Sequence, residues 1–418
     1  MSLILGGNMR LVHAADVHLD SPLRGLTRLG DSDLAHLLRQ ATRRALENLT
    51  DLTVDRRADA LLLAGDIYDG NWRDYATGRF FVEQMARLHD EKIPVFMIAG
   101  NHDAESEITR ALILPPNVTV FASDQAGTGT VEEIGLAVHG QSYPTRDVYT
   151  NLARAYPNAI PGMVNVGLLH TAVEGSEDHA AYAPCTADDL ARTGYDYFAL
   201  GHVHAHRIVR DGEHVAAFSG NLQGRHPRES GPKGALVVEV EPGRAAMISH
   251  EPCDVARWAT LTIDVTPCHT LEDVLTRVTG ELGATRREAG TRPVVARLVL
   301  VGASRTAAGL TDDERLREEL ATVAASLDVS IEKILVRAVS PEQPASVDPE
   351  LMAAIHAAAD DLAKNADLLA ALIGPLEREV GRPLRAADLL DLRDPGALVD
   401  LARRAGVGLV ARLVGDED

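Results

Sequence analysis

The sequence predicts an α/β protein with three parts: a layered α/β domain over residues 9–250, a small βαβαβ domain over 251–340, and a linker with a C-terminal helical region over 341–418. Three observations support this organisation. Strand-like apolar runs alternate with amphipathic helices in the first part, which is typical of layered α/β domains. The same alternation restarts close to Pro252. Finally, a Pro-rich stretch at 341–344 precedes a segment rich in Ala and Leu, which indicates a linker followed by helices.

Two amphipathic helices are expected in the first part. Residues 33–58 and 73–89 place Leu, Ala, Phe and Met side chains at helical spacing. Further along, the strand-like runs 207–210 and 215–218 flank an Asp-Gly pair, which is a signal for a β-hairpin. The later strands are therefore expected to be richer in antiparallel pairs and to form a second sheet packed on the first.

Five apolar runs in this first part end in side chains typical of metal sites. Each run is rich in aliphatic residues, as expected of a buried strand. Polar groups at such a position are costly unless they have partners or a task. The side chains that follow the five runs are Asp16 and His18; Asp66; Asn101, His102 and Asp103; His170; and His202 and His204. Their position at strand ends predicts a di-metal hydrolase site.

Carboxylates, imidazoles and an amide provide nitrogen and oxygen ligands, which suit Mn²⁺, Fe²⁺ or Zn²⁺, and the ligand set without thiolates does not fit a zinc finger. Asp66 is the expected bridging ligand, because it follows a glycine at the tightest turn. A bridging hydroxide would attack phosphorus in line. The remaining ligands are expected to be Asp16, His18 and one of His202 and His204 for the first ion, and Asn101, His170 and the other histidine of that pair for the second.

His102 and Asp103 are expected to act in catalysis. In an extended chain the side chain of His102 points away from that of Asn101. His102 is therefore placed to donate a proton to the leaving oxygen or to stabilise charge on the phosphoryl group. Asp103 is expected to fix the tautomer of His102. Asp69 is either a carboxylate behind the site or a turn-capping residue.

Two further sets of residues are interpreted from their position alone. Arg225 and Arg228, in a loop beyond the histidine pair, either contact a substrate phosphate or lie in a solvated loop. His13 lies inside the first strand, where a hydrogen-bonded core histidine is expected rather than a ligand.

Charge and composition limit the partners and the compartment. The 418 residues carry a formal net charge of −20, so strong autonomous affinity for DNA is not expected, and bound metals or a positively charged partner would have to assist. Three widely separated cysteines fit reduced thiols in a cytoplasmic protein. The sequence has no run of about 18 apolar residues, so no membrane span is predicted. Residues 1–8 are interpreted as a short leader.

The strand-end blocks resemble those of the calcineurin-like metallophosphoesterase superfamily. The stretch VHAADVHLDSP at 12–22 resembles the DNA-repair exonuclease branch that includes bacterial SbcD and YhaO. The later stretch GNLQGRHPR at 220–228 resembles YhaO in particular. The resemblance spans roughly residues 9–240, whereas the accessory domain matches only in pattern and the C-terminal helices match weakly.

The resemblance implies a four-layer αββα sandwich with two metals at one edge, and His102 as the catalytic histidine. It implies manganese as the metal, a homodimer, and a partner ATPase of the SbcC type with a long coiled coil. The ligands that it implies are Asp16, His18, Asp66 and His204 for the first metal, and Asp66, Asn101, His170 and His202 for the second.

The leading functional hypothesis is a Mn²⁺-dependent exonuclease or endonuclease that hydrolyses phosphodiester bonds at DNA ends in double-strand break repair. The alternative is a di-metal phosphodiesterase or phosphomonoesterase that acts on a small nucleotide. The accessory domain and the helical tail favour a large substrate or a partner. A scaffold that has lost its metals is a third hypothesis, and the complete ligand set argues against it.

Overall fold

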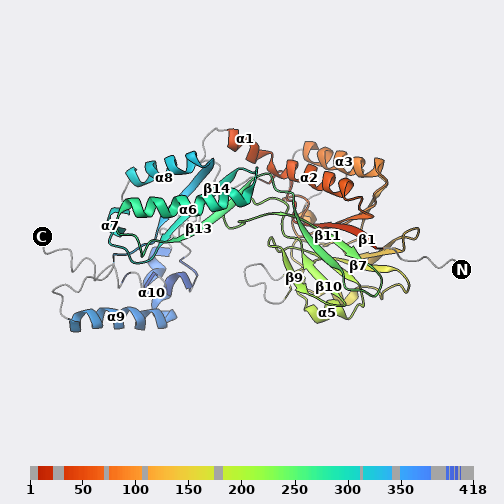
Figure 1. The fold of residues 1–418 in the computed structure, drawn as a ribbon. Helices are drawn as coiled ribbons and strands as arrows, with labels where there is room; N and C mark the ends of the chain where they lie inside the picture. Colours follow the sequence, from red (N-terminus) through yellow and green to blue (C-terminus); the bar gives the residue numbers. More distant parts are fainter. Residues whose placement is uncertain are drawn as a thin grey trace. The chain divides into compact units, whose positions relative to one another are not determined.

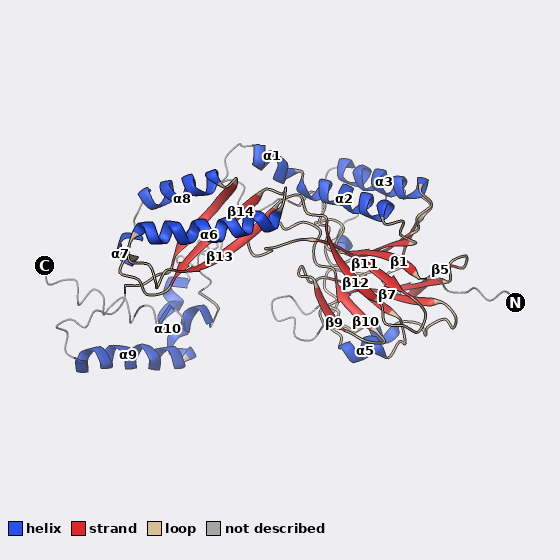
Figure 2. Cartoon of the chain, viewed as in Figure 1, coloured by secondary structure: helices blue, strands red, loops and turns tan. Residues whose placement is uncertain are grey.

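The computed structural model describes residues 8–21, 33–69, 75–105, 112–173, 182–310, 314–340, 349–377, 392–394, 396–399, 401–402 and 405 (Figures 1 and 2). The chain divides into two compact units, which are Met1–Leu261 with Leu282–Arg297 and Ala324–Lys333, and Thr262–Glu281 with Leu298–Val323 and Ile334–Asp418. Most of the expected leader and the Pro-rich stretch at 341–344 lie outside the described residues. Within the described residues, no helix combines the length and apolar character that a membrane span requires.

The first sheet has six described strands in the order β12-β11-β1-β2-β3-β4. The four strands β1 to β4 run parallel, and β11 and β12 extend the sheet in antiparallel fashion beside β1. The bounds are β1 (Met9–Ala14), β2 (Ala60–Ala64), β3 (Val95–Ile98), β4 (Val118–Val120), β11 (Gly234–Val240) and β12 (Met247–Pro252).

The second sheet also has six described strands, in the order β5-β6-β7-β8-β10-β9. Its centre, from β6 to β10, is parallel, and its two edge strands are antiparallel. The predicted hairpin is β9 and β10, which pair antiparallel around the Asp-Gly turn. The bounds are β5 (Gly127–Val131), β6 (Leu136–Gly140), β7 (Val164–His170), β8 (Tyr197–Gly201), β9 (Arg207–Arg210) and β10 (Val215–Phe218).

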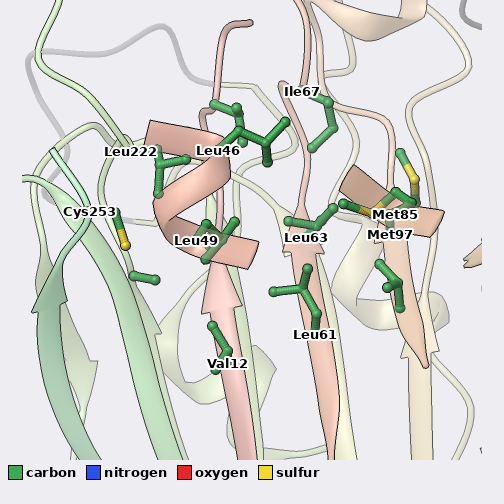
Figure 3. Packing of buried hydrophobic residues seen from close by; sticks show 14 of the residues in the cluster. Val12, Leu46, Leu49, Leu61, Leu63, Ile67, Met85, Met97, Leu222 and Cys253 are labelled. Atoms are coloured by element: carbon green, nitrogen blue, oxygen red, sulfur yellow. The ribbon is translucent and has the colours of Figure 1, made fainter. Parts of the chain in front are cut away.

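The two sheets pack face to face, with helices on their outer faces. The core between the sheets is apolar and fully buried, with Leu62 and Phe96 from the first sheet against Val166 and Tyr197 from the second. On the outer face of the first sheet, α2 (Ala41–Asp55) and α3 (Tyr75–Asp90) pack their Leu, Phe and Met side chains on β1, β2 and β3 (Figure 3). A short 3₁₀ helix (Leu152–Ala155) and α5 (Ala187–Ala191) cover the second sheet. These layers confirm the predicted four-layer α/β fold.

One predicted helix is broken. The expected helix at 33–58 is divided into α1 (Asp33–Arg39) and α2, with Gln40 between them outside helical geometry. The two pieces pack on different cores. Leu38 of α1 packs on Trp258 and Val295, whereas α2 packs on the first sheet. A single straight helix cannot serve both cores, so tertiary packing overrides the continuous helical pattern of the sequence.

The remaining strands form a three-stranded sheet, in the predicted order of elements. The sheet has the order β13-β14-β15, and helices α6 and α8 precede its second and third strands. Beyond it lie α9 and α10, and α10 continues through Gly374-Pro375, although a Gly-Pro pair usually interrupts a helix. The bounds are β13 (Arg257–Asp264), α6 (Leu271–Ala289), β14 (Val294–Val301), α7 (Ala307–Leu310), α8 (Glu314–Ser326), β15 (Val329–Val336), α9 (Pro349–Lys364) and α10 (Ala366–Leu376).

His13 joins the two main sheets by hydrogen bonds inside the core. It is fully buried on β1, and its Nδ1 lies 2.8 Å from the Tyr197 hydroxyl of β8. Its Nε2 lies 3.2 Å from the backbone oxygen of Leu200. Burial lowers the pKa of His13 to about 3, so the folded chain holds this side chain neutral. The expected hydrogen-bonded core histidine is therefore what the structure contains.

This histidine makes stability depend on pH. The unfolded chain protonates His13 below its ordinary pKa of 6.5, whereas the folded chain excludes that proton until about 3, so acid favours the unfolded state. We expect His13→Gln to lose less unfolding free energy than the wild type between about pH 7 and pH 5, by about 2 kcal/mol. Urea unfolding at the two pH values measures this difference. The exposed His89 provides the control, because His89→Gln should follow the wild type; equal losses for all three proteins would contradict the prediction.

Candidate metal centre

The strand ends turn sharply at the predicted ligands. Asp16, His18, Asp66 and His202 have φ angles of 51°, 46°, 52° and 102°. Residues other than glycine rarely adopt this left-handed backbone conformation, and the strain persists only where the surrounding structure enforces it. Four of the seven predicted ligand positions thus share a costly backbone conformation. Such clustering is a physical mark of a functional site.

Glycines allow the strand ends to approach each other closely. A Cβ on Gly100 would collide with the carboxylate and backbone of Asp66. Gly65 has φ +93°, and a Cβ there would lie 2.6 Å from Nδ1 of His170. The ends of β2, β3 and β7 therefore meet with no room for an additional methyl group.

The predicted ligands converge where the carboxyl ends of the two sheets meet. Three groups of side chains each place one ligand atom per residue within 4.8 Å of one another: Asp16, His18 and His204; His18, Asp66 and His102; and Asp16, Asp66 and His170. Asp66 belongs to two of these groups. Its Oδ2 lies 3.4 Å from Nε2 of His170 and 4.0 Å from Nε2 of His18. Asp66 therefore lies between His18, from the predicted ligands of the first ion (the first half of the site), and His170, from those of the second ion (the second half).

Asn101 and His202, which are predicted ligands of the second ion, lie beside His170. Oδ1 of Asn101 lies 3.0 Å from Nε2 of His170. The ring of His202 lies 5.3 Å from that of His170, centroid to centroid. The backbone N–H of His202 donates to both carboxylate oxygens of Asp16, at 3.0 and 3.2 Å. The structure thus brings all seven predicted ligands into one cluster.

The residues present fit divalent cations. Nδ1 of His170 is 2.9 Å from the backbone oxygen of Ala64, and donating to it leaves the lone pair of Nε2 facing Asn101 and Asp66. Nδ1 of His204 is held in the same way by Glu229, at 2.8 Å. Nε2 of His204 then faces Nε2 of His18 at 3.2 Å. Converging nitrogen and oxygen lone pairs in a buried site are what a hard or borderline cation requires.

The electrostatics of the cluster favour a charged carboxylate at Asp66. Burial would raise the pKa of Asp66, but His170, His18 and His102 hold it well below its usual range. Burial lowers the pKa of His18, which keeps this imidazole neutral and able to ligate. Although burial opposes its protonation, the charge of Asp66 raises the pKa of His170 to about 9. A cation would replace that proton between the two groups.

Asp69 is the carboxylate partner of His102. Its Oδ1 lies 3.0 Å from Nδ1 of His102, and its Oδ2 accepts a hydrogen bond of 2.7 Å from Ser21. The hydrogen bond from His102 holds the pKa of Asp69 far below its usual range, and in return it raises the pKa of His102. The backbone N–H of His102 also donates to Oδ1 of Asp66, at 2.9 Å. The contact between Asp69 and the His102 imidazole favours the interpretation of Asp69 as a carboxylate behind the site.

Asp103 has a different role from the one that the sequence predicted. Its buried carboxylate accepts three backbone hydrogen bonds, from Ile67 at 3.1 Å, Tyr68 at 2.8 Å and Gly100 at 3.0 Å. These bonds tie the end of β2 to the end of β3. The prediction that Asp103 orients His102 is therefore wrong, because its oxygens are committed to the backbone and Asp69 lies beside the imidazole.

The two predicted arginines differ in burial. Arg225 is half-buried beside the first half of the site, with long contacts of 3.3 Å to Ser21, 3.4 Å to Glu229 and 3.9 Å to Asp69. Its buried Nε has no hydrogen-bond partner among the residues that the structure describes. Arg228 is exposed.

Sequence reasoning missed Glu229 entirely. This buried carboxylate contacts His204 from a position 25 residues further along the chain. Its place directly after the two arginines is the one signal that could have drawn attention to it.

The comparisons with known proteins agree with this geometry. Residues 9–206 match the family model of calcineurin-like phosphoesterases, and residues 258–339 match that of the middle domain of the metallophosphoesterase YhaO. The uncharacterized metallophosphoesterase YhaO of Bacillus subtilis is 32% identical over 298 residues, which cover 71% of this chain and 72% of that protein.

Two further relatives are named as nucleases or repair proteins. The SbcD component of the SbcCD nuclease of Bacillus subtilis is 25% identical over 279 residues, or 57% of this chain and 68% of that protein. The DNA double-strand break repair protein Mre11 of Methanopyrus kandleri is 23% identical over 215 residues, or 47% and 44%. The chain belongs to the YhaO family of calcineurin-like metallophosphoesterases.

Proposed function

We propose that this phosphoesterase is a Mn²⁺-dependent DNA nuclease that hydrolyses phosphodiester bonds at DNA ends in double-strand break repair. The observation that carries the proposal is the convergence of seven candidate nitrogen and oxygen ligands, with Asp66 lying between His18 and His170. Relatives named as a component of the SbcCD nuclease and as Mre11 support DNA as the substrate. Fe²⁺ and Zn²⁺ are the alternative metals, since the donor set also suits them.

In the proposed mechanism, divalent cations held by these residues would supply Lewis acidity that activates water and neutralises charge on the phosphoryl oxygens. His102 donates its Nδ1–H to Asp69, and this bond raises the pKa of His102, so that the protonated imidazole also carries an Nε2–H that can stabilise or protonate the departing oxygen. The proposed ligands are Asp16, His18, Asp66 and His204 for the first ion, and Asp66, Asn101, His170 and His202 for the second.

Arg225 and Arg228 are the proposed contacts to DNA phosphates. The contacts of Arg225 are long, and its Nε has no partner within the described part of the chain, which leaves donor capacity for an anion beside the site. The net charge of −20 works against binding DNA without help. We therefore include in the proposal a homodimer and an SbcC-like coiled-coil ATPase that delivers DNA, acting in the cytoplasm. The proposed parts are a nuclease domain (9–250), an accessory domain (251–340) and a C-terminal linker and helical region (341–418).

The proposal is tested with end-labelled linear duplex DNA, the purified chain and Mn²⁺. We expect the wild type to release label and His102→Ser to be slower by about a hundredfold or more. Hydrolysis of a chromogenic phosphodiester is assayed in parallel. Hydrolysis of this small ester with intact DNA would favour the alternative, a phosphodiesterase or phosphomonoesterase for small nucleotides. Failure on both substrates, with no metal bound, would reject an enzyme altogether.

A further inference from the structure

His204 is more exposed than His18 and His170, two other predicted metal ligands. Its side chain is 21% exposed, whereas those of His18 and His170 are fully buried. The buried imidazoles are oriented by the packing around them. A partly exposed imidazole after a strand end has several accessible rotamers, and restricting it to one costs conformational entropy. Something outside the site must therefore hold His204 in its ligating orientation.

The segment 219–233 surrounds His204. It crosses from the end of β10 in the second sheet to the start of β11 in the first. Three side chains from this segment, Asn221, Glu229 and Lys233, are buried beside His204 and are here named the His204 cradle. Each makes a hydrogen bond to His204 or to another member of the cradle.

Glu229 fixes the imidazole ring. Its Oε1 lies 2.8 Å from Nδ1 of His204, so the ring carries its proton there and presents Nε2 to the site. Its Oε2 accepts from the Asn221 side chain at 2.9 Å and from the backbone of Arg225 at 2.6 Å. With both oxygens engaged, the carboxylate is itself fixed in position.

Lys233 fixes the backbone of the same residue. Its Nζ donates to the carbonyl oxygen of His204 at 2.7 Å, which is a charge-assisted bond in a buried setting. The backbone N–H of Asn221 donates to that oxygen as well, at 3.3 Å. Ring and backbone of His204 are thus held independently, by two charged groups of opposite sign.

The cradle is anchored to the first residues of β13. The buried indole of Trp258 donates to the carbonyl of Gly224 at 2.9 Å, and its own carbonyl accepts from Gly231 at 3.0 Å. The hydroxyl of Thr260 donates to the carbonyl of Pro227 at 2.8 Å. The loop that carries Glu229 is therefore hydrogen-bonded to β13, the first strand of the region that matches the YhaO middle domain.

We propose that Glu229 and Lys233 are positioning residues that set the metal affinity of the first half of the site through His204, without contacting a metal themselves. The inference rests on the metal centre of the proposed function. The effect is confined to the first half of the site, because His170 and Asn101 in the second half are positioned by other groups, the carbonyl of Ala64 among them. Loss of the cradle should therefore weaken one metal site and spare the other.

The test is a Mn²⁺ titration of the metal-free full-length chain, with free Mn²⁺ followed by electron paramagnetic resonance. We expect two sites in the wild type. In Glu229→Ala and Lys233→Met, one site should weaken by about 10- to 100-fold while the other keeps its affinity. Glu229→Gln, which retains an acceptor oxygen, should lie between the wild type and Glu229→Ala. The controls are Glu239→Gln, on β11 and paired with Arg10, and Lys364→Met, exposed on α9.

The outcomes separate the inference from the proposed function. A wild type that binds no Mn²⁺ would reject the metal centre and the inference together. Two wild-type sites that stay unchanged in Glu229→Ala and Lys233→Met would overturn the inference alone. Equal weakening of both sites, with unchanged thermal melting of the metal-free protein, would also overturn it. If the alanine variant melts early, the glutamine variant decides, because it must still weaken one site selectively.

Discussion

Asp66→Asn is expected to abolish phosphodiester hydrolysis, with a loss of about a thousandfold or more. Asp66 is nearly fully buried, and its Oδ2 lies between His18 and His170, from the two halves of the site. A neutral amide removes the negative charge that two cations would share. It also brings an N–H₂ group into a place where acceptors are needed. Hydrolysis of a chromogenic phosphodiester measures the loss, and metal content after purification should fall in parallel.

Asp59 provides a control on the same strand. It precedes β2, whereas Asp66 follows it, and its carboxylate accepts a 2.7 Å bond from the backbone of Arg10. Asp59→Asn changes the same charge at the opposite end of the strand, so it should retain its metals and most of its activity. If Asp66→Asn kept two metals and wild-type rates, a bridging role for Asp66 would be refuted.

Replacing Asp69 by Asn should lower activity, whereas replacing Asp103 by Asn should lower stability. Asp69→Asn is expected to lower kcat by about a hundredfold or more while both metals stay bound, because His102 loses the carboxylate that orients it. Asp103→Asn is expected to lower the melting temperature, because an amide has one acceptor oxygen for three backbone N–H donors. Steady-state kinetics, metal analysis and thermal melting of both variants make the comparison.

The contrast between these two variants is the informative result. A severe loss of kcat in Asp103→Asn at wild-type stability would restore the role that the sequence predicted for Asp103. A normal kcat in Asp69→Asn would show that His102 needs no carboxylate partner.

The candidate ligands were accessible from the sequence because of where they stand. A polar residue directly after a buried apolar run has few structural reasons to be there, so Asp16, Asp66 and His170 are conspicuous. The four-layer fold followed from the same strand and helix periodicities. What the sequence reveals in this way is local: the end of each strand and the chemistry it delivers.

Interactions between strand ends were not accessible. Asp103 is next to His102 in the chain, yet the carboxylate that contacts the His102 imidazole is that of Asp69, which follows another strand. Glu229 likewise reaches His204 from across a sheet-to-sheet crossover. The division of the first long helix at Gln40 depends on Trp258, which is far away in the sequence. Each of these outcomes is decided by tertiary packing, which has no periodic signature along the chain.

The site takes its side chains from two sheets, and this has a consequence for the core between them. Asp66 follows a strand of the first sheet and His170 ends a strand of the second, so the distance between the two side chains depends on how the sheets pack on each other. Metal coordination tolerates errors of only about 0.2 Å in ligand distance. A core side chain such as Leu62 or Val166, exchanged for a larger or smaller one, would slide or tilt the sheets by amounts of this order. Substitutions in this apolar interior are therefore expected to disturb metal binding as well as stability.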